Sequence, residues 1–349
     1  MTEKPRSRRG QPSKGAARRA APEDAAASKA AARDGASPGP GPEGAARDLL
    51  VPLLDAMIRA VRAATARVVS SGRKRRAAEA SAEDPGGDAE AVHDFRVALR
   101  RLRTVVRIVR DMHGRKRMRK IGEDLKRYAD ATGALRDEEV LRETLTALEV
   151  TPRTRQALAQ WMERRRRQEL SRRSGVVTLL REDGSAPRAL VRPPMPLQAS
   201  LADTLARLEK RLARGGADVS ALDLALASMS RARRDVREHA AATPADAEAM
   251  HTLRIRFKRL RYTAELFAPV LADAAAAVRG ATKMQKRLGE LHDLDEALLR
   301  VSRAWGLSPR HRATVLAALR AWRGRAAERA RTDVAAEIGS WLPADPTRA

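Results

Sequence analysis

Cysteine is absent from the sequence, and no uncharged apolar run approaches the ~18 residues that a membrane span requires. Without cysteine, a disulfide framework and a thiolate metal site are both excluded. The basic N-terminal segment MTEKPRSRRGQPSKG lacks the apolar core of a secretory signal. These absences predict a cytoplasmic protein without a membrane partner.

Aromatic residues, which favour strands, make up only 3% of the chain. Alanine, leucine, arginine and glutamate, all good helix formers, dominate instead. From Asp48 onward, apolar residues recur at helical spacing. The composition therefore predicts an all-α protein built of helical bundles.

Acidic residues are also too few to balance the basic ones. The chain of 349 residues carries 70 Lys and Arg against 44 Asp and Glu, a formal net charge of +26. A charge of this size destabilises a compact state by self-repulsion unless ions or a polyanion screen it. The balance therefore indicates an anionic partner without identifying it.

Segments rich in proline and glycine divide the chain. Residues 1–47 combine Ala, Gly, Pro, Ser and charge without apolar periodicity, which predicts a disordered basic tail. The stretch REDGSAPRALVRPPMPLQAS predicts a linker over residues 181–200. We expect one helical repeat over residues 48–180 and a second over residues 201–342.

The second half of the chain repeats the first in three places. VHDFRVALRRLR at 92–103 returns as MHTLRIRFKRLR at 250–261, and GALRDEE at 133–139 matches GELHDLD at 289–295. A loop predicted over residues 73–88 accounts for the extra spacing in the first half. Three matches in the same order predict two helical bundles related by a pseudo-twofold axis. The third match pairs Met57, Arg59 and Arg62 with Met229, Arg231 and Arg234.

The first repeated segment places its basic residues on one helical face. At about 100° per residue, apolar side chains such as Phe95 and Leu99 fall on the opposite face and can dock into a core. From His93 to Arg103 the helix rises ~15 Å, a length that suits an extended anion better than a single phosphate. The basic face carries His93, Arg96, Arg100, Arg103, Arg107 and Arg110, and its second copy carries His251, Arg254, Lys258 and Arg261.

Two interpretations of this basic face compete. A solvated helix surface is the ordinary one, because charge on an outer face is common. However, carboxylates at i±4, which would neutralise such a surface, are almost absent from 93–110 and 251–261. Like charges kept close together without partners cost free energy, and the face is reproduced in both halves. Binding of a polyanion is therefore the favoured interpretation.

The pattern H-x-x-R-x-x-x-[RK]-[RK]-x-R in both halves resembles the CHAD (conserved histidine α-helical domain) family, as do GALRDEE and GELHDLD. The resemblance covers roughly residues 48–340. It implies two four-helix bundles about a pseudo-twofold axis, with a basic central channel that binds inorganic polyphosphate. It also implies residence on polyphosphate granules, where other granule-associated proteins are possible partners.

The resemblance also implies a set of binding residues, carried over position by position. The pattern itself supplies the principal binders: His93, Arg96, Arg100, Arg103 and Arg107, with His251, Arg254, Lys258 and Arg261. Alignment on the glycine elements and on the upstream match adds secondary candidates: Arg127, Lys283, Arg59 and Arg231. Glu139 departs from the aspartate found at Asp295, which affects the helix junction of the first half.

Other chemistry is weakly supported. Neither His93 nor His251 has a second ligand at i+3 or i+4, so no metal or other cofactor is expected. Asp137 with Glu139, and Asp293 with Asp295, are expected to cap helices that follow a glycine-containing break. The remaining predictions concern single side chains: His113, His239 and His311 are expected at the surface, and Trp161 and Trp322 in the core.

Three functions remain in competition, and the third, an enzyme of polyphosphate or nucleotide metabolism, lacks the clustered carboxylates that would hold its metal ion. A non-enzymatic polyphosphate-binding protein is the leading one, and no P-loop, metalloprotease or nucleophile-elbow motif indicates an enzyme. A nucleic-acid-binding protein is the alternative, since sequence-independent phosphate contacts use the same residues. Against it, aromatics that stack on bases are scarce.

Overall fold

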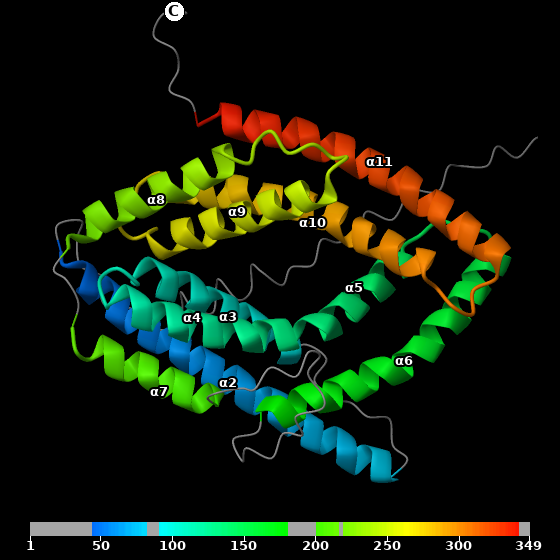
Figure 1. Ribbon diagram of the computed structural model, residues 1–349, viewed down its shortest axis with the longest axis horizontal. Helices are drawn as coiled ribbons and strands as arrows, with labels where there is room; N and C mark the ends of the chain where they lie inside the picture. The colour runs from blue at the N-terminus through cyan, green and yellow to red at the C-terminus, as the bar shows by residue number, and fades with distance from the viewer. Residues whose placement is uncertain (1–43, 82–90, 181–199, 216–218, 342–349) are drawn as a thin grey trace, which may run out of the picture. The chain divides into compact units, whose positions relative to one another are not determined.

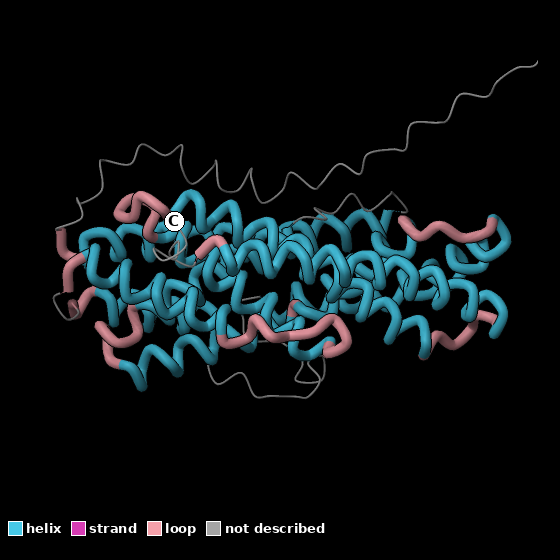
Figure 2. The backbone as a smooth tube through the Cα atoms, turned by 90° about the horizontal axis from the view of Figure 1, so that it is seen from above, coloured by secondary structure: helices cyan, strands magenta, loops and turns pink. Residues whose placement is uncertain are grey.

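The computed structural model describes residues 44–81, 91–180, 200–215 and 219–341 (Figure 1). Figure 2 shows that helices account for nearly all of this part of the chain, and no strand occurs within it. The all-α prediction is therefore confirmed. The helices are α2 (Ala46–Ser81), α3 (Ala91–Ile108), α4 (Arg115–Ala131), α5 (Gly133–Thr146), α6 (Pro152–Leu180), α7 (Leu201–Leu212), α8 (Ala221–Arg237), α9 (Ala247–Leu266), α10 (Ala274–Ser302) and α11 (Pro309–Gly339).

Side-chain caps set the starts of several helices. Ser200 and Asp203 form a reciprocal capping box at the start of α7. Ser220 caps α8, Asp246 caps α9, and Ser308 caps α11 immediately before Pro309. These contacts satisfy amide groups that have no partner inside the helix.

The helices of the second half follow those of the first in the same order. By the matched segments α2 corresponds to α8, α3 to α9, and α4 with α5 to α10, and by element order α6 corresponds to α11. Each of α2, α3, α5 and α6 also packs on its own counterpart. Contacts between like elements are what a pseudo-twofold axis produces. At the helix starts, Ala46 N–H donates to Val219 O and Ala221 N–H donates to Gly44 O, both at 2.8 Å.

The two halves share their hydrophobic cores. One cluster joins α2, α3, α4 and the end of α6 to α7, α8, α9, the first part of α10 and the end of α11. The other joins α5 and the start of α6 to the second part of α10 and the start of α11, and it contains Trp161. The predicted repeats at 48–180 and 201–342 are thus units of sequence whose apolar faces pack together. Helix α2 begins at Ala46, inside the predicted tail, whereas residues 1–43 of the tail and residues 181–199 of the linker lie outside the described residues.

Three local predictions are wrong. Helix α2 continues to Ser81 rather than ending near Gly72, because RKRRAAEA consists of strong helix formers. The predicted caps at Asp293 and Asp295 lie inside the continuous helix α10, and α5 begins after Thr132, well before Asp137. His113 is 2% exposed rather than on the surface, because its Nδ1 lies 3.1 Å from Gly215 O. Trp161 is buried, and Trp322 packs against the same cluster, as predicted.

A buried carboxylate connects the two halves. Glu138 on α5 is 6% exposed and accepts hydrogen bonds from Arg165 of α6 at 2.6 Å and from Arg300 of α10 at 2.8 Å. The position that corresponds to Glu138 in the second half is Leu294, so the repeats do not reveal this contact.

Candidate functional site

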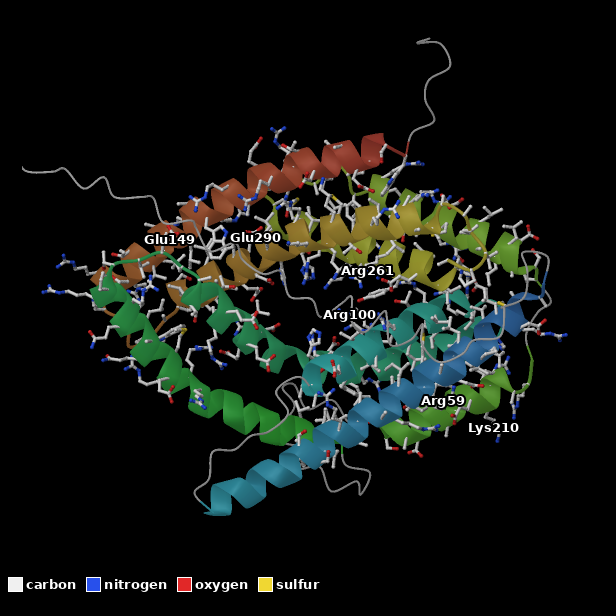
Figure 3. The ribbon with its side chains drawn as sticks, turned by 180° about the vertical axis from the view of Figure 1, so that it is seen from behind. Arg59, Arg100, Glu149, Lys210, Arg261 and Glu290 are labelled. Carbon is white, nitrogen blue, oxygen red and sulfur yellow. The ribbon has the colours of Figure 1, made fainter. Side chains whose placement is uncertain are left out.

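The basic faces of α3 and α9 meet along a seam between the two halves. The two helices pack on each other, and Figure 3 shows Arg100 and Arg261 on its two sides. Arg100 Nη1 donates to the hydroxyl of Tyr262 across the seam at 3.4 Å. The positive charges of Arg96, Arg100 and Arg254 all lower the pKa of the Lys258 ammonium group. We call these three arginines and Lys258 the central cluster.

Positive charge in the central cluster exceeds what nearby carboxylates neutralise. Burial, followed by Arg254 and Arg100, holds the pKa of the Lys258 ammonium well below its usual range. Burial also lowers the pKa of the Arg254 guanidinium, against the opposing effect of Asp293. Lowered pKa values mean that the fold disfavours these charges, so an anion that binds here would relieve the strain on both.

The two glycine elements lie against equivalent arginines. A Cβ atom added at Gly133 would lie 3.7 Å from Arg96 Nη1, and one added at Gly289 would lie 3.9 Å from Arg254 Nε. A hydrogen in place of a side chain lets each guanidinium approach the neighbouring helix backbone. The repeated glycines therefore both lie beside the basic faces, Gly133 at the break between α4 and α5 and Gly289 inside α10.

The two equivalent arginines nevertheless have different partners. Arg96 Nη1 donates to Ala129 O and to Thr132 Oγ1, both at 3.0 Å, where the chain breaks between α4 and α5. Helix α10 has no such break, and Arg254 Nε is buried without a hydrogen-bond acceptor among the described residues. A helix end supplies free carbonyl groups, whereas a continuous helix uses them internally.

A pair of histidines borders the central cluster. His251 Nδ1 lies 3.3 Å from His292 Nδ1, with ring centroids 4.5 Å apart. Burial, Arg254 and the neighbouring His251 lower the pKa of His292 to about 3, and burial with Arg254 lowers that of His251. Both rings are therefore neutral at pH 7. The sequence analysis missed His292, although it lies in GELHDLD, because its distance from His251 depends on how α9 and α10 pack.

We expect the ligand-free protein to lose stability as the pH falls below 6.5, the ordinary histidine value. Because both pKa values are lowered by folding, unfolded His251 and His292 bind more protons there than the folded ones, so the free energy of unfolding rises with pH up to that value. One group contributes at most ~1.4 kcal/mol per pH unit, and partial solvation reduces this. Thermal melts over about pH 4.5–7.5 should show a flatter dependence for His292→Gln. Equal slopes in the two proteins would contradict this assignment.

The structure distinguishes among the predicted site residues. Arg103 and Arg107 lie on α3 and form no side-chain hydrogen bond or ion pair with any described residue, and burial lowers the pKa of both. Arg261 is 3% exposed, pairs with Glu265 at 2.7 Å and donates to Gln285 at 3.3 Å, so no free charge remains on it. Its predicted contact with the ligand is therefore disfavoured. His93 is partly buried on α3.

The secondary candidates lie outside the seam. Arg127 pairs with the buried Asp124 at 2.8 Å, and Lys283 pairs with Asp333 at 2.9 Å. Arg59 and Arg231 are exposed on α2 and α8, and Figure 3 shows Arg59 away from Arg100. An ion pair within α4, whose Asp124 also binds Arg207 of α7 at 2.7 Å, and an ion pair between α10 and α11 explain the first two without any ligand. Contact of these four residues with a polyanion stays a prediction.

Two searches of the described residues add to this description. They contain no group of three or more His, Cys, Asp or Glu side chains placed to hold a metal ion. None of the helices in these segments combines the length and the hydropathy that crossing a bilayer requires.

Comparison with known proteins agrees with this architecture. The family model of the CHAD domain matches residues 73–302. The crystal structure of the CHAD domain from the plant Ricinus communis superposes with a TM-score of 0.58 at 18% identity, covering 86% of this chain and 98% of that one. No curated protein matches the sequence. The matched family model spans both basic faces and both glycine elements, and the chain therefore belongs to the CHAD domain family.

Proposed function

We propose that this protein binds inorganic polyphosphate along the α3–α9 seam without catalysing a reaction, and that this binding holds it on polyphosphate granules. CHAD domains are associated with polyphosphate binding in general. The specific ligand, the place where it binds and the granule are the parts that we propose for this chain. On the granule, the protein would also come into contact with other granule-associated proteins, which we propose as its further partners.

The observation that carries the proposal is the uncompensated charge at the seam. Lys258, Arg103 and Arg107 form no ion pair within the described part of the chain, and burial lowers the pKa of each. Facing cations in partly buried positions repel one another in the ligand-free protein. A chain of phosphate groups would replace that repulsion with charge-assisted hydrogen bonds, which are stronger than neutral ones.

The shape of the charge distribution favours a linear polyanion without bases. The basic faces follow two helices over several turns, so successive phosphates of one chain would meet successive cations. Phe95 and Phe257 are fully buried on the apolar faces, and Tyr262 is 5% exposed. At the seam, therefore, the described residues present no aromatic surface on which nucleic-acid bases would stack.

Competition binding at near-physiological salt tests the proposal. Labelled long-chain polyphosphate is challenged with unlabelled duplex DNA, single-stranded RNA and heparin, each matched by phosphate or sulfate concentration. We expect polyphosphate to resist displacement and Arg254→Ala/Lys258→Ala to weaken it by about tenfold to a hundredfold. Arg320→Ala/Arg325→Ala is the matched control, since it removes two exposed cations from α11.

Two results would overturn the proposal. Equal competition by DNA or RNA per phosphate would make nucleic acid the leading partner. A loss of affinity in the α11 control as large as that in the seam variant would show that net charge alone holds the ligand. In cells that form polyphosphate granules, the wild type should follow the granules and the seam variant should disperse.

A further inference from the structure

The two basic faces do not match along their whole length. In the alignment that pairs His93 with His251, Arg96 corresponds to Arg254 and Arg100 to Lys258. Arg103 still corresponds to Arg261, but two helical turns beyond Arg100 the correspondence fails, because Glu265 stands where the first half has Arg107. The central cluster therefore lies near the pseudo-twofold axis, but the charge beyond it differs on the two sides.

On the α9 side, the basic face ends in an ion pair. Glu265 Oε1 lies 2.7 Å from Arg261 Nε, and Gln285 of α10 accepts a further hydrogen bond from Arg261 Nη1 at 3.3 Å. The guanidinium also lies over the Tyr262 ring, 5.3 Å from its centroid. Each of these contacts comes from the protein itself, so this end of the seam is closed to an anion.

On the α3 side, the basic face continues and gains two cations from α9. Arg107 interacts with Arg259, Arg103 and Arg256, and burial with Arg259 lowers the pKa of its guanidinium to about 10. Arg256 Nε is buried without an acceptor in the segments that the structure describes. We call Arg103, Arg107, Arg256 and Arg259 the side cluster.

One carboxylate faces the side cluster from α8. Asp235 lies 3.6 Å from Arg256 Nη1 and also interacts with Arg107 and Arg259. Asp130 of α4 also acts on Arg103, but it pairs with Lys126 at 2.5 Å, so these two carboxylates leave the four arginines with an excess of positive charge. The equivalent positions on the other side of the axis hold Ala98, Arg101, Arg261 and Glu265, so one cation is replaced by alanine and another by a carboxylate.

We infer that the polyphosphate path is one-sided: the chain enters the central cluster and leaves past the side cluster between α3, α8 and α9. This inference rests on the proposed function and adds Arg256 and Arg259 to the site. The symmetric alternative, in which the chain passes Arg261 equally, is blocked by Glu265. The central cluster alone would hold a short polyphosphate, and the side cluster would add contacts only for a longer one.

Two ligand lengths test the inference. Tripolyphosphate and long-chain polyphosphate are each titrated into the wild type, into Arg107→Ala/Arg259→Ala and into Arg254→Ala/Lys258→Ala. Arg107→Ala/Arg259→Ala should lower the affinity for long-chain polyphosphate by about tenfold and reduce the slope of log affinity against log salt. Tripolyphosphate affinity should change by less than about twofold. Arg254→Ala/Lys258→Ala should lower the affinity for both ligands. Arg320→Ala/Arg325→Ala controls for charge, and melting curves confirm that each variant folds.

The outcomes separate this inference from the proposed function. If the side-cluster variant loses no more long-chain affinity than the α11 control, the one-sided path is wrong while polyphosphate binding stands. If the side-cluster variant loses as much affinity for tripolyphosphate as for the long chain, the two clusters act as one site and the one-sided path is also wrong. If neither ligand binds the wild type, the proposed function itself fails.

Discussion

Replacing Glu138 with alanine should lower the free energy of unfolding by about 3 kcal/mol, at the lower end of the range for breaking a buried ion pair. The carboxylate accepts hydrogen bonds from Arg165 Nε at 3.1 Å, from Arg165 Nη2 at 2.6 Å and from Arg300 Nη1 at 2.8 Å. Removing it leaves two partly buried guanidinium groups beside the apolar cluster that joins α5, α6, α10 and α11. The loss is limited because Arg300 keeps Asp137 at 3.5 Å and Glu296 at 3.7 Å.

Urea denaturation followed by circular dichroism measures this effect. Glu149→Ala is the control, because it removes the same charge from an exposed position (Figure 3) and should change stability by less than about 0.5 kcal/mol. Glu138→Gln should fall between the two, since the amide retains one acceptor oxygen but no charge. If Glu138→Ala is as stable as the Glu149 control, the two halves are not connected through this carboxylate.

Reversing two charges of the central cluster should affect binding and stability in opposite directions. In Arg100→Glu/Lys258→Glu, long-chain polyphosphate should lose more than about a hundredfold in affinity, because two attractive contacts become repulsive. The ligand-free variant should melt at a higher temperature than the wild type. Its new carboxylates would lie beside Arg254 and Arg103, which repel the native cations.

Arg320→Glu/Arg325→Glu removes the same net charge from the exposed face of α11 and provides the control. It should change affinity by less than about tenfold at near-physiological salt, where exposed charges are screened. If the wild type melts at a higher temperature than Arg100→Glu/Lys258→Glu, the native cations are not strained. Stability gained together with binding lost is the pattern expected of a site maintained for a ligand.

The sequence by itself determined the class of the fold, the order of the matched segments in the two halves and the residue types on the basic faces. Helical periodicity, helix-forming composition and the paired H-x-x-R patterns depend only on residues close together in the chain, so they can be recognised before the tertiary structure is known. They placed Arg96, Arg100, Arg254 and Lys258 on faces that the structure brings together. The placement of Phe95 and Phe257 on the opposite faces is likewise confirmed.

Only the tertiary structure decided which of those charges stay available. Gln285, distant in the chain, joins the nearby Glu265 in satisfying Arg261, and Asp333 pairs with Lys283. His292 was not among the predicted residues, yet it lies beside His251, and Arg256 and Arg259 join Arg107 from a face of α9 outside the repeated pattern. The contribution of a charge depends on its distance to other charges and on its burial. Packing between helices sets both quantities, and a single helix pattern contains neither.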